Sequence, residues 1–221
     1  KLTRGSVTAD PTSTAQVSFD AAQNATYEFD IHWDLAPVKA GPRVRHIHAG
    51  SLATVIEPGA GRARAAIIEN RDRATLSYDP NIRPGIMGDL AAIRPGTEDT
   101  GLLYPSRASE AVIEHWLSLG AALVVLTRGA EGVTYRTRKG EVISRPTLAT
   151  RVVDTVGAGD SFMAGLLSGL LDLELIGSVE ARAALHESSS EAVRPAIDRA
   201  LAASAITVGH AGAYAPGIDE L

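Results

Sequence analysis

The most informative segment of this chain is Asp154-Thr155-Val156-Gly157-Ala158-Gly159-Asp160-Ser161-Phe162-Met163-Ala164-Gly165. Gly157, Ala158 and Gly159 are small enough to let backbone N–H groups close on an anion, and the pattern after them predicts a helix over 160–171. The positive end of that helix dipole would face the loop. Asp160 places a carboxylate where the loop becomes helix. Because phosphoryl transfer to a hydroxyl needs an anion cradle, a helix terminus and a positioned carboxylate, the segment indicates this chemistry.

Two commoner phosphate-binding motifs are excluded by the order of residues. The P-loop pattern needs a Gly-Lys pair, and no such pair occurs in the chain. The dinucleotide-binding pattern needs a glycine three positions after Gly159, where Phe162 stands. A purely structural alternative stays open, namely that Asp160 only caps a helix beside a glycine turn.

Composition bounds the remaining classes. The chain has 221 residues, of which 45% are hydrophobic, so one domain with a real core is expected. A formal net charge of −5 argues against nucleic-acid or membrane partners. No cysteine is present, which removes disulfides and thiolate sites. No apolar run approaches the roughly 18 residues of a membrane span. We therefore expect a cytoplasmic protein.

Hydrophobic periodicity and turn residues predict the order of elements. Strand–helix alternation predicts an α/β fold with a mostly parallel sheet and helices on both sides. A helix capped by Ser109 and a hairpin turn at Lys139-Gly140 are part of this prediction, and 187–190 is expected to be a mobile loop. The predicted strands are 15–19, 26–31, 44–48, 75–79, 122–126, 131–136 and 141–145, and the predicted helices are 58–71, 109–120, 160–171 and 193–208.

The segment 154–165 resembles the C-terminal signature of the ribokinase-like (PfkB) family of carbohydrate kinases. The resemblance implies a three-layer ribokinase-like fold, with a mostly parallel central sheet, helices on both faces and a small β-lid. It implies that Asp160 is the catalytic base and that Gly157, Ala158 and Gly159 form the anion hole. It covers nearly all of 1–221 as one kinase domain. The family's first strands and Gly-Gly…Asn sugar motif are not found, so we expect that the N-terminal part is absent from this sequence.

A second motif, Asp79-Pro80-Asn81-Ile82-Arg83-Pro84, ends a predicted strand, where open α/β sheets keep their ligand sites. The prolines stiffen the loop, so Asn81 and Arg83 are held in place. A fixed guanidinium there would bind a phosphoryl group and sugar hydroxyls. The hexapeptide resembles the fructokinase and 2-keto-3-deoxygluconate kinase branch of the family. The alternative is a proline-bounded turn with a surface arginine.

A glycine-rich loop, Thr127-Arg128-Gly129-Ala130-Glu131-Gly132, follows the predicted buried strand. It resembles the family's ATP-binding loop, which would give ATP contacts to Thr127, Gly129 and Gly132. The last helix contains the small residues Ala202, Ala203, Ser204 and Ala205. They would form either a wall of the adenine slot or a tight packing surface, and the sequence favours neither.

Metal sites are implied by resemblance alone. Glu98 and Asp99 are similar to the family's acidic turn, which organises Mg²⁺ through water, and a solvated loop pair is the alternative. The segment 90–99 is too short for the expected crossover, and we expect residues to be missing there. Asp154 and the Val156 carbonyl match the monovalent-cation site of some members, which would hold K⁺. His46 and His48 share a strand face without a third ligand nearby, so a structural role is favoured.

The resemblance implies an ATP-dependent kinase that phosphorylates a primary hydroxyl of a small sugar. Fructose is the first choice of acceptor, and 2-keto-3-deoxygluconate is the alternative. A catalytically silent sugar or nucleotide sensor on the same fold is the alternative outside enzymes. The implied cofactors are ATP and Mg²⁺, with K⁺ where the cation site is used. Strands within 12–31 would contribute to a β-lid, through which family members often pair, so a homodimer is one assembly to test.

Overall fold

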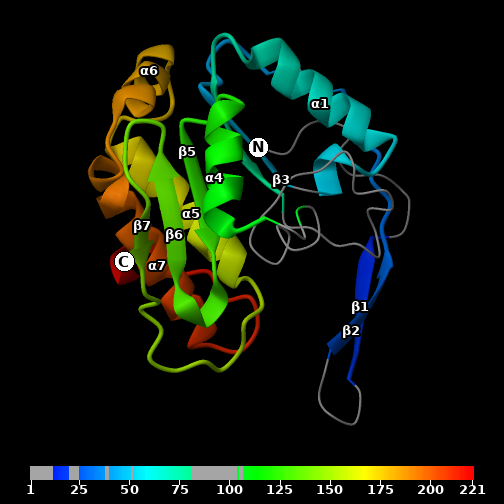
Figure 1. The fold of residues 1–221 in the computed structure, drawn as a ribbon. Coiled ribbons are helices and arrows are strands. Elements are labelled where there is room, and N and C mark those ends of the chain that lie inside the picture. The colour runs from blue at the N-terminus through cyan, green and yellow to red at the C-terminus, as the bar shows by residue number, and fades with distance from the viewer. Residues whose placement is uncertain (1–11, 20–24, 38–39, 51, 81–103, 105–106) are drawn as a thin grey trace.

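The computed structural model describes residues 12–19, 25–37, 40–50, 52–80, 104 and 107–221 (Figure 1). The predicted site residues Asn81, Arg83, Glu98 and Asp99 lie outside these ranges, as does the short segment 90–99. Their predicted roles therefore stay predictions.

An N-terminal hairpin extends away from the remaining described elements (Figure 1). It pairs β1 (Thr14–Phe19) with β2 (Ala25–Asp30) in antiparallel register, with Thr14 opposite Asp30. Both strands were predicted from their alternating pattern. The expectation that 12–31 contributes to a lid remains a prediction.

The next unit is a β–helix–β crossover, in which a helical connection joins two parallel strands. Strands β3 (His46–Gly50) and β4 (Thr75–Asp79) are parallel, with His48 opposite Ser77 and Gly50 opposite Asp79. The short helix η1 (Leu52–Thr54) and helix α1 (Gly59–Asn70) connect them. Parallel neighbours need such a long connection, so this pairing follows from the predicted helix between the two strands.

The remaining strands form an antiparallel sheet of β5 (Leu123–Thr127), β6 (Val133–Thr137) and β7 (Ile143–Arg145). Among the described strands, β3 and β4 form a parallel pair, whereas β5, β6 and β7 are antiparallel and belong to a separate sheet. The reason is the length of the connections. The turn with η3 (Gly129–Glu131) and the predicted hairpin at Lys139-Gly140 are too short for a parallel crossover.

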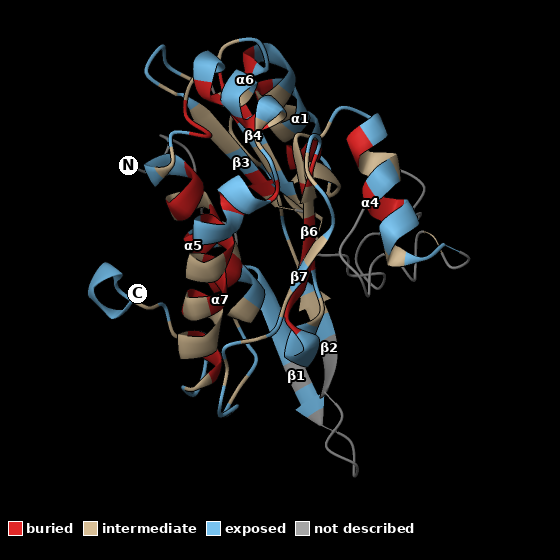
Figure 2. Ribbon diagram, turned by 60° about the vertical axis from the view of Figure 1, so that its left-hand side comes forward, coloured by how far each residue is buried: buried red, intermediate tan, exposed pale blue. Residues whose placement is uncertain are grey.

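Helices cover both faces of the β5–β7 sheet, as predicted. Val133 and Tyr135 of β6 face a core formed with α5 (Ala158–Asp172) and α7 (Arg194–Val208). Val124 and Leu126 of β5 pack on α4 (Ser109–Ser118) instead. The buried residues lie between the helices and the strands in Figure 2. This follows from the period of two along each strand.

Helices α5 and α7 approach closely because glycines face alanines. A Cβ atom at Gly165 would lie 2.9 Å from the Ala200 Cα, and one at Gly169 would lie 2.5 Å from the Ala196 Cα. Both alanines are fully buried. Small residues on the two helices therefore set their separation, and with it the position of the first turn of α5.

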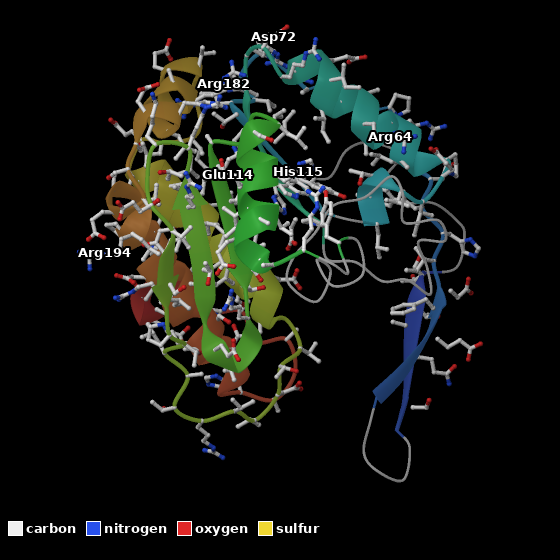
Figure 3. The ribbon with its side chains drawn as sticks, in the orientation of Figure 1. Arg64, Asp72, Glu114, His115, Arg182 and Arg194 are labelled. Carbon is white, nitrogen blue, oxygen red and sulfur yellow. The ribbon has the colours of Figure 1, made fainter. Side chains whose placement is uncertain are left out.

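Two local features differ from the prediction. Ala108 is the N-cap of α4 and makes no side-chain capping bond, so Ser109 is the first helical residue rather than the cap. Helix α6 (Val179–Glu187) was not predicted; the Ser178 hydroxyl caps it by accepting from the Ala181 N–H. Arg182 of α6 donates to the Asp72 carbonyl oxygen at 3.2 Å, which ties α6 to the end of α1 (Figure 3).

The segment 187–190, expected to be mobile, is packed against β6. The Ser190 hydroxyl accepts from the Thr137 N–H at 3.0 Å, and the Thr137 hydroxyl donates to the Ser188 carbonyl oxygen at 2.8 Å. Ser190 is 1% exposed. The polar composition suggested solvent, but these hydroxyls serve buried backbone groups. The short helix η4 (Glu191–Val193) follows, and η5 (Ile218–Glu220) lies near the C-terminus.

Candidate active site

The first turn of α5 is built around Gly157. This residue is the N-cap of the helix and has φ of 80°, in the left-handed region that favours glycine. A Cβ atom there would also lie 3.0 Å from the Ala213 Cβ. Conformation and space therefore both require glycine at the point where the chain enters the helix.

Backbone N–H groups are available at this helix start. The Ala158 N–H donates to the Thr155 carbonyl oxygen at 3.2 Å, and the Ser161 N–H donates to the Gly157 carbonyl oxygen at 2.9 Å. Among the described residues, the N–H groups of Gly157, Gly159 and Asp160 have no such partner. These groups, rather than that of Ala158, are the ones left to bind an anion at the positive end of the helix dipole.

The Asp160 side chain is exposed in the first turn of α5. It makes no hydrogen bond with any residue that the structure describes, and Gly157 offers no side-chain cap. The alternative that Asp160 serves as a helix cap is therefore not supported. An exposed carboxylate beside unpaired N–H groups can instead accept a proton from a bound hydroxyl.

A cavity of about 420 Å³ opens directly beside Asp160. This volume lies within the range of roughly 300–1,000 Å³ typical of small-molecule sites. Its walls come from α5, from α7 and from the C-terminal segment 213–221, and include Asp160, Ala164, Gly165, Ser168, Ala203 and Tyr214. Of the small residues predicted for a nucleotide wall, Ala203 lines the cavity, while α7 meets the glycines of α5 through Ala196 and Ala200. Packing and cavity lining are thus divided along α7.

Asp154 joins the segment before α5 to the segment after α7. One carboxylate oxygen accepts from the Val156 N–H at 3.0 Å, and the other accepts from the Gly212 N–H at 2.9 Å. These bonds lower the pKa of Asp154, with the Val156 bond as the largest cause. The Val153 N–H donates to the Val208 carbonyl oxygen at 2.7 Å. The predicted cation pair, Asp154 and Val156, therefore lies where two backbone segments converge.

Thr207 makes buried polar contacts that the sequence did not predict. Its fully buried hydroxyl oxygen lies 2.6 Å from the Ser161 hydroxyl and 2.9 Å from the Tyr214 carbonyl oxygen. It thus connects α7, the residue after Asp160 and the wall of the cavity. The side chain of Tyr214 stacks on His210 with ring centroids 4.0 Å apart, and its hydroxyl donates to the Glu220 carboxylate at 3.0 Å.

Replacing Thr207 by Val is expected to lower the free energy of unfolding by about 1–3 kcal/mol, because the Ser161 hydroxyl would lose a buried partner. Urea unfolding of the full-length protein measures this loss. Thr207→Ser is the matched control, since it keeps the hydroxyl and is expected to retain most of the stability. Equal stability of wild type and Thr207→Val would contradict the assigned role.

The predicted nucleotide loop divides into residues with different roles. Gly132 has φ of 93°, and a Cβ atom there would lie 2.1 Å from the Arg145 carbonyl oxygen, so glycine is required for packing against the end of β7. Gly129 has φ of 52° and open space around its Cβ position. Thr127 is exposed at the end of β5. This loop and the segment leading into α5 lie at the same end of the β5–β7 sheet (Figure 1).

His46 and His48 are hydrogen-bonded within the β3–β4 pair. His46 contacts the Thr75 hydroxyl at 2.7 Å and the Ser77 hydroxyl at 3.0 Å, and His48 contacts the Ser77 hydroxyl at 2.8 Å. Burial is the main cause that lowers the pKa of both imidazoles. No group of three His, Cys, Asp or Glu residues suited to a metal ion occurs in the described ranges. The metal-pair interpretation therefore gains no support.

Residues 92–220, more than half of the chain, match the family of pfkB carbohydrate kinases. The chain belongs to this family. It is 35% identical over 138 residues to a fructokinase of Rhizobium leguminosarum bv. trifolii, covering 56% of this chain and 42% of the relative. It is 36% identical over 112 residues to a 2-dehydro-3-deoxygluconokinase of Bacillus subtilis (strain 168), covering 44% of this chain and 35% of the relative. The chain thus spans less than half the length of either relative.

The fold of this family member is similar to that of a solved fructokinase double mutant from Vibrio cholerae O395, in a form with fructose, ADP and potassium ion bound. The TM-score is 0.73 at 21% identity, covering 92% of this chain and 70% of that chain. The fold is therefore ribokinase-like, as the resemblance implied. No helix in the described part of this PfkB chain has the length and hydropathy needed to cross a membrane.

Proposed function

We propose that the protein is an ATP-dependent sugar kinase that phosphorylates a primary hydroxyl of a small sugar. The proposal is carried by the Asp160 carboxylate, which makes no hydrogen bond with any described residue. It lies beside the unpaired N–H groups at the start of α5, and a cavity opens next to it. Fructose is the proposed acceptor, supported by the similarity to fructokinases. The similarity to a 2-dehydro-3-deoxygluconokinase makes that sugar acid the second candidate.

In the proposed reaction, Asp160 accepts the proton of the sugar hydroxyl as its oxygen attacks the γ-phosphorus of ATP. The new O–P bond forms as the bond between the γ-phosphorus and the bridging oxygen breaks, and ADP leaves. The N–H groups of Gly157, Gly159 and Asp160 stabilise charge on the phosphoryl oxygens. Orientation contributes more here than base strength, because phosphoryl transfer has a loose transition state.

The two ends of ATP are assigned to different parts of the site. The cavity wall at Ala203 is proposed to contact the adenine of ATP. The loop with Thr127, Gly129 and Gly132 is proposed to approach the nucleotide through its backbone. Asn81 and Arg83 are proposed to bind the sugar and the transferring phosphoryl group. The supporting observation for the cavity is its position beside the helix start that would hold the phosphates.

Two cations complete the proposal. Mg²⁺ would neutralise charge on the β- and γ-phosphates, and Glu98 and Asp99 would hold it through water. Mg²⁺ is bound largely by phosphate oxygens and water, so few protein ligands are needed. K⁺ would take oxygen ligands from Asp154 and the Val156 carbonyl. The ionised Asp154 carboxylate, placed between two backbone segments, supports this assignment.

The proposed function is tested by ADP release from the full-length protein with ATP, Mg²⁺ and a panel of fructose, 2-keto-3-deoxygluconate, ribose and adenosine. We expect turnover on fructose with a kcat/KM at least about tenfold above that of the other acceptors, as a site that hydrogen-bonds its substrate discriminates strongly. Turnover on the sugar acid alone would select the second candidate. Nucleotide binding without turnover on any acceptor would favour a sugar or nucleotide sensor.

A further inference from the structure

A chain of hydrogen bonds crosses the β3–β4 pair from the α5–α6 turn to His48 in the middle of β3. The Gly177 N–H donates to the Thr75 hydroxyl at 2.9 Å, and that hydroxyl lies 2.7 Å from His46 Nδ1. His46 Nε2 lies 3.0 Å from the Ser77 hydroxyl, which lies 2.8 Å from His48 Nδ1. Backbone, hydroxyl and imidazole groups thus alternate along one face of the two strands.

The direction of the chain follows from its first donor. A backbone N–H can only donate, so the Thr75 oxygen accepts from Gly177 and is free to give its own hydrogen to one of two neighbours. His46 Nδ1 lies at 2.7 Å, whereas the Arg45 carbonyl oxygen lies at 3.3 Å, beyond the usual O–H···O distance. The shorter distance favours donation from Thr75 to His46 Nδ1 over donation to Arg45, which assigns the His46 hydrogen to Nε2.

The same reasoning fixes the tautomer of His48. His46 Nε2–H donates to the Ser77 hydroxyl, which then donates to His48 Nδ1. His48 therefore carries its hydrogen on Nε2. Partial desolvation lowers the pKa of the otherwise exposed His48 and outweighs the Asp79 and Asp160 carboxylates, which raise it, and this favours the neutral imidazole. The hydrogen-bond chain requires a neutral His48 imidazole, because a protonated ring could not accept from the Ser77 hydroxyl.

The Nε2–H group of His48 takes no part in this hydrogen-bond chain. Nε2–H has no hydrogen-bond partner among the residues that the structure describes, and the His48 side chain is exposed. His48 lies two residues before the carboxyl end of β3, the end beyond which open α/β sheets bind ligands. It also lies within electrostatic reach of Asp160. An oriented donor at this place is available to a hydroxyl acceptor that approaches Asp160.

We propose that His48 donates its Nε2–H to a hydroxyl or keto oxygen of the acceptor sugar, and that the chain from Gly177 holds this donor in orientation. The inference rests on the proposed function and deepens it, since it names a specificity-determining contact on the acceptor. Ser77 and His46 act as positioning residues, because they reach the sugar only through His48.

Nitrogen NMR of the full-length protein with ¹⁵N-labelled histidine tests the geometry without relying on catalysis. We expect His46 and His48 both to show the Nε2–H tautomer, and the His48 Nε2–H resonance alone to shift when fructose is added. Ser77→Ala is expected to release His48 from the single tautomer. An Nδ1–H tautomer at His48, or fructose binding without a shift at His48, would overturn the proposal.

Kinetics of two amide variants test the contact with the acceptor. An Asn side chain reaches only the Nδ1 position of imidazole, whereas Gln reaches the Nε2 position and restores a donor there. We expect His48→Asn to raise the KM for the sugar about tenfold with the KM for ATP unchanged, and His48→Gln to stay within about threefold of wild type.

The outcomes separate the two proposals. An unchanged sugar KM in His48→Asn, or equal losses in both variants with a lowered unfolding midpoint, would overturn the His48 contact while leaving the kinase proposal intact. A wild type that neither turns over nor binds any sugar would overturn the proposed function, and the His48 contact with it.

Discussion

Replacing Asp160 by Asn is expected to lower kcat by at least about a thousandfold, while the affinity for ATP changes less than about threefold. Asn has nearly the same shape and keeps the first turn of α5, but it cannot accept the proton of the attacking hydroxyl. General-base catalysis of this kind contributes roughly 10²–10⁴-fold, and the carboxylate also orients the hydroxyl. The measurement is steady-state turnover of the full-length protein, with nucleotide affinity from calorimetry.

Asp172→Asn is the matched control for this prediction. It makes the same substitution in the last turn of α5, where the carboxylate pairs with Arg199 at 2.6 Å. We expect wild-type turnover in the control. Asp160→Asn that retained more than a tenth of wild-type turnover would remove Asp160 as the base.

The second large effect is expected from a pair of glycine substitutions that separate stability from chemistry. Gly159→Ala places a methyl group in open space at the helix start, since no atom outside the neighbouring backbone of α5 lies within 4 Å of the Cβ position. The folded protein should tolerate it, and Ala in a helix gains up to about 1 kcal/mol over Gly. The same methyl group would occupy the space proposed for the phosphates, so we expect turnover to fall at least about a hundredfold.

Gly157→Ala is expected to behave differently, because it strains the backbone at φ of 80° and meets Ala213. We expect a loss of about 1–3 kcal/mol in the free energy of unfolding, together with the loss of turnover. Gly212→Ala measures the cost of backbone strain alone in the free energy of unfolding, since Gly212 has φ of 73° with open space around its Cβ position. Urea unfolding and ADP release of the three variants are the measurements. Wild-type turnover in Gly159→Ala would contradict the proposed anion site.

The parts of the fold and site that could be predicted are those governed by local sequence. Small residues followed by an apolar periodic run predicted the start of α5, and the long connection at 58–71 predicted the crossover between β3 and β4. The carboxylate of Asp160 could be placed at a helix start because its neighbours determine that geometry.

The parts that could not be predicted depend on contacts distant in sequence. Thr207 meets Ser161 across 46 positions, and the Gly177 N–H meets Thr75 across 102 positions. No periodicity in either segment reports such a pair. The hairpin signal at Lys139-Gly140 predicted the antiparallel β6–β7 pair, which is confirmed, whereas the antiparallel pairing of β5 with β6 was not predicted. Likewise, three serines in a row suggested a solvated loop, although Ser190 is buried.

The transfer of the γ-phosphoryl group itself tests the central claim most directly. Full-length protein in excess over γ-labelled ATP, with Mg²⁺ and fructose, is quenched through a single turnover and the products are separated. We predict that the label passes to a sugar phosphate in the wild type and in Asp172→Asn, and stays on ATP in Asp160→Asn over the same interval. Bound ATP whose label never reaches fructose or any other sugar of the panel would contradict the account.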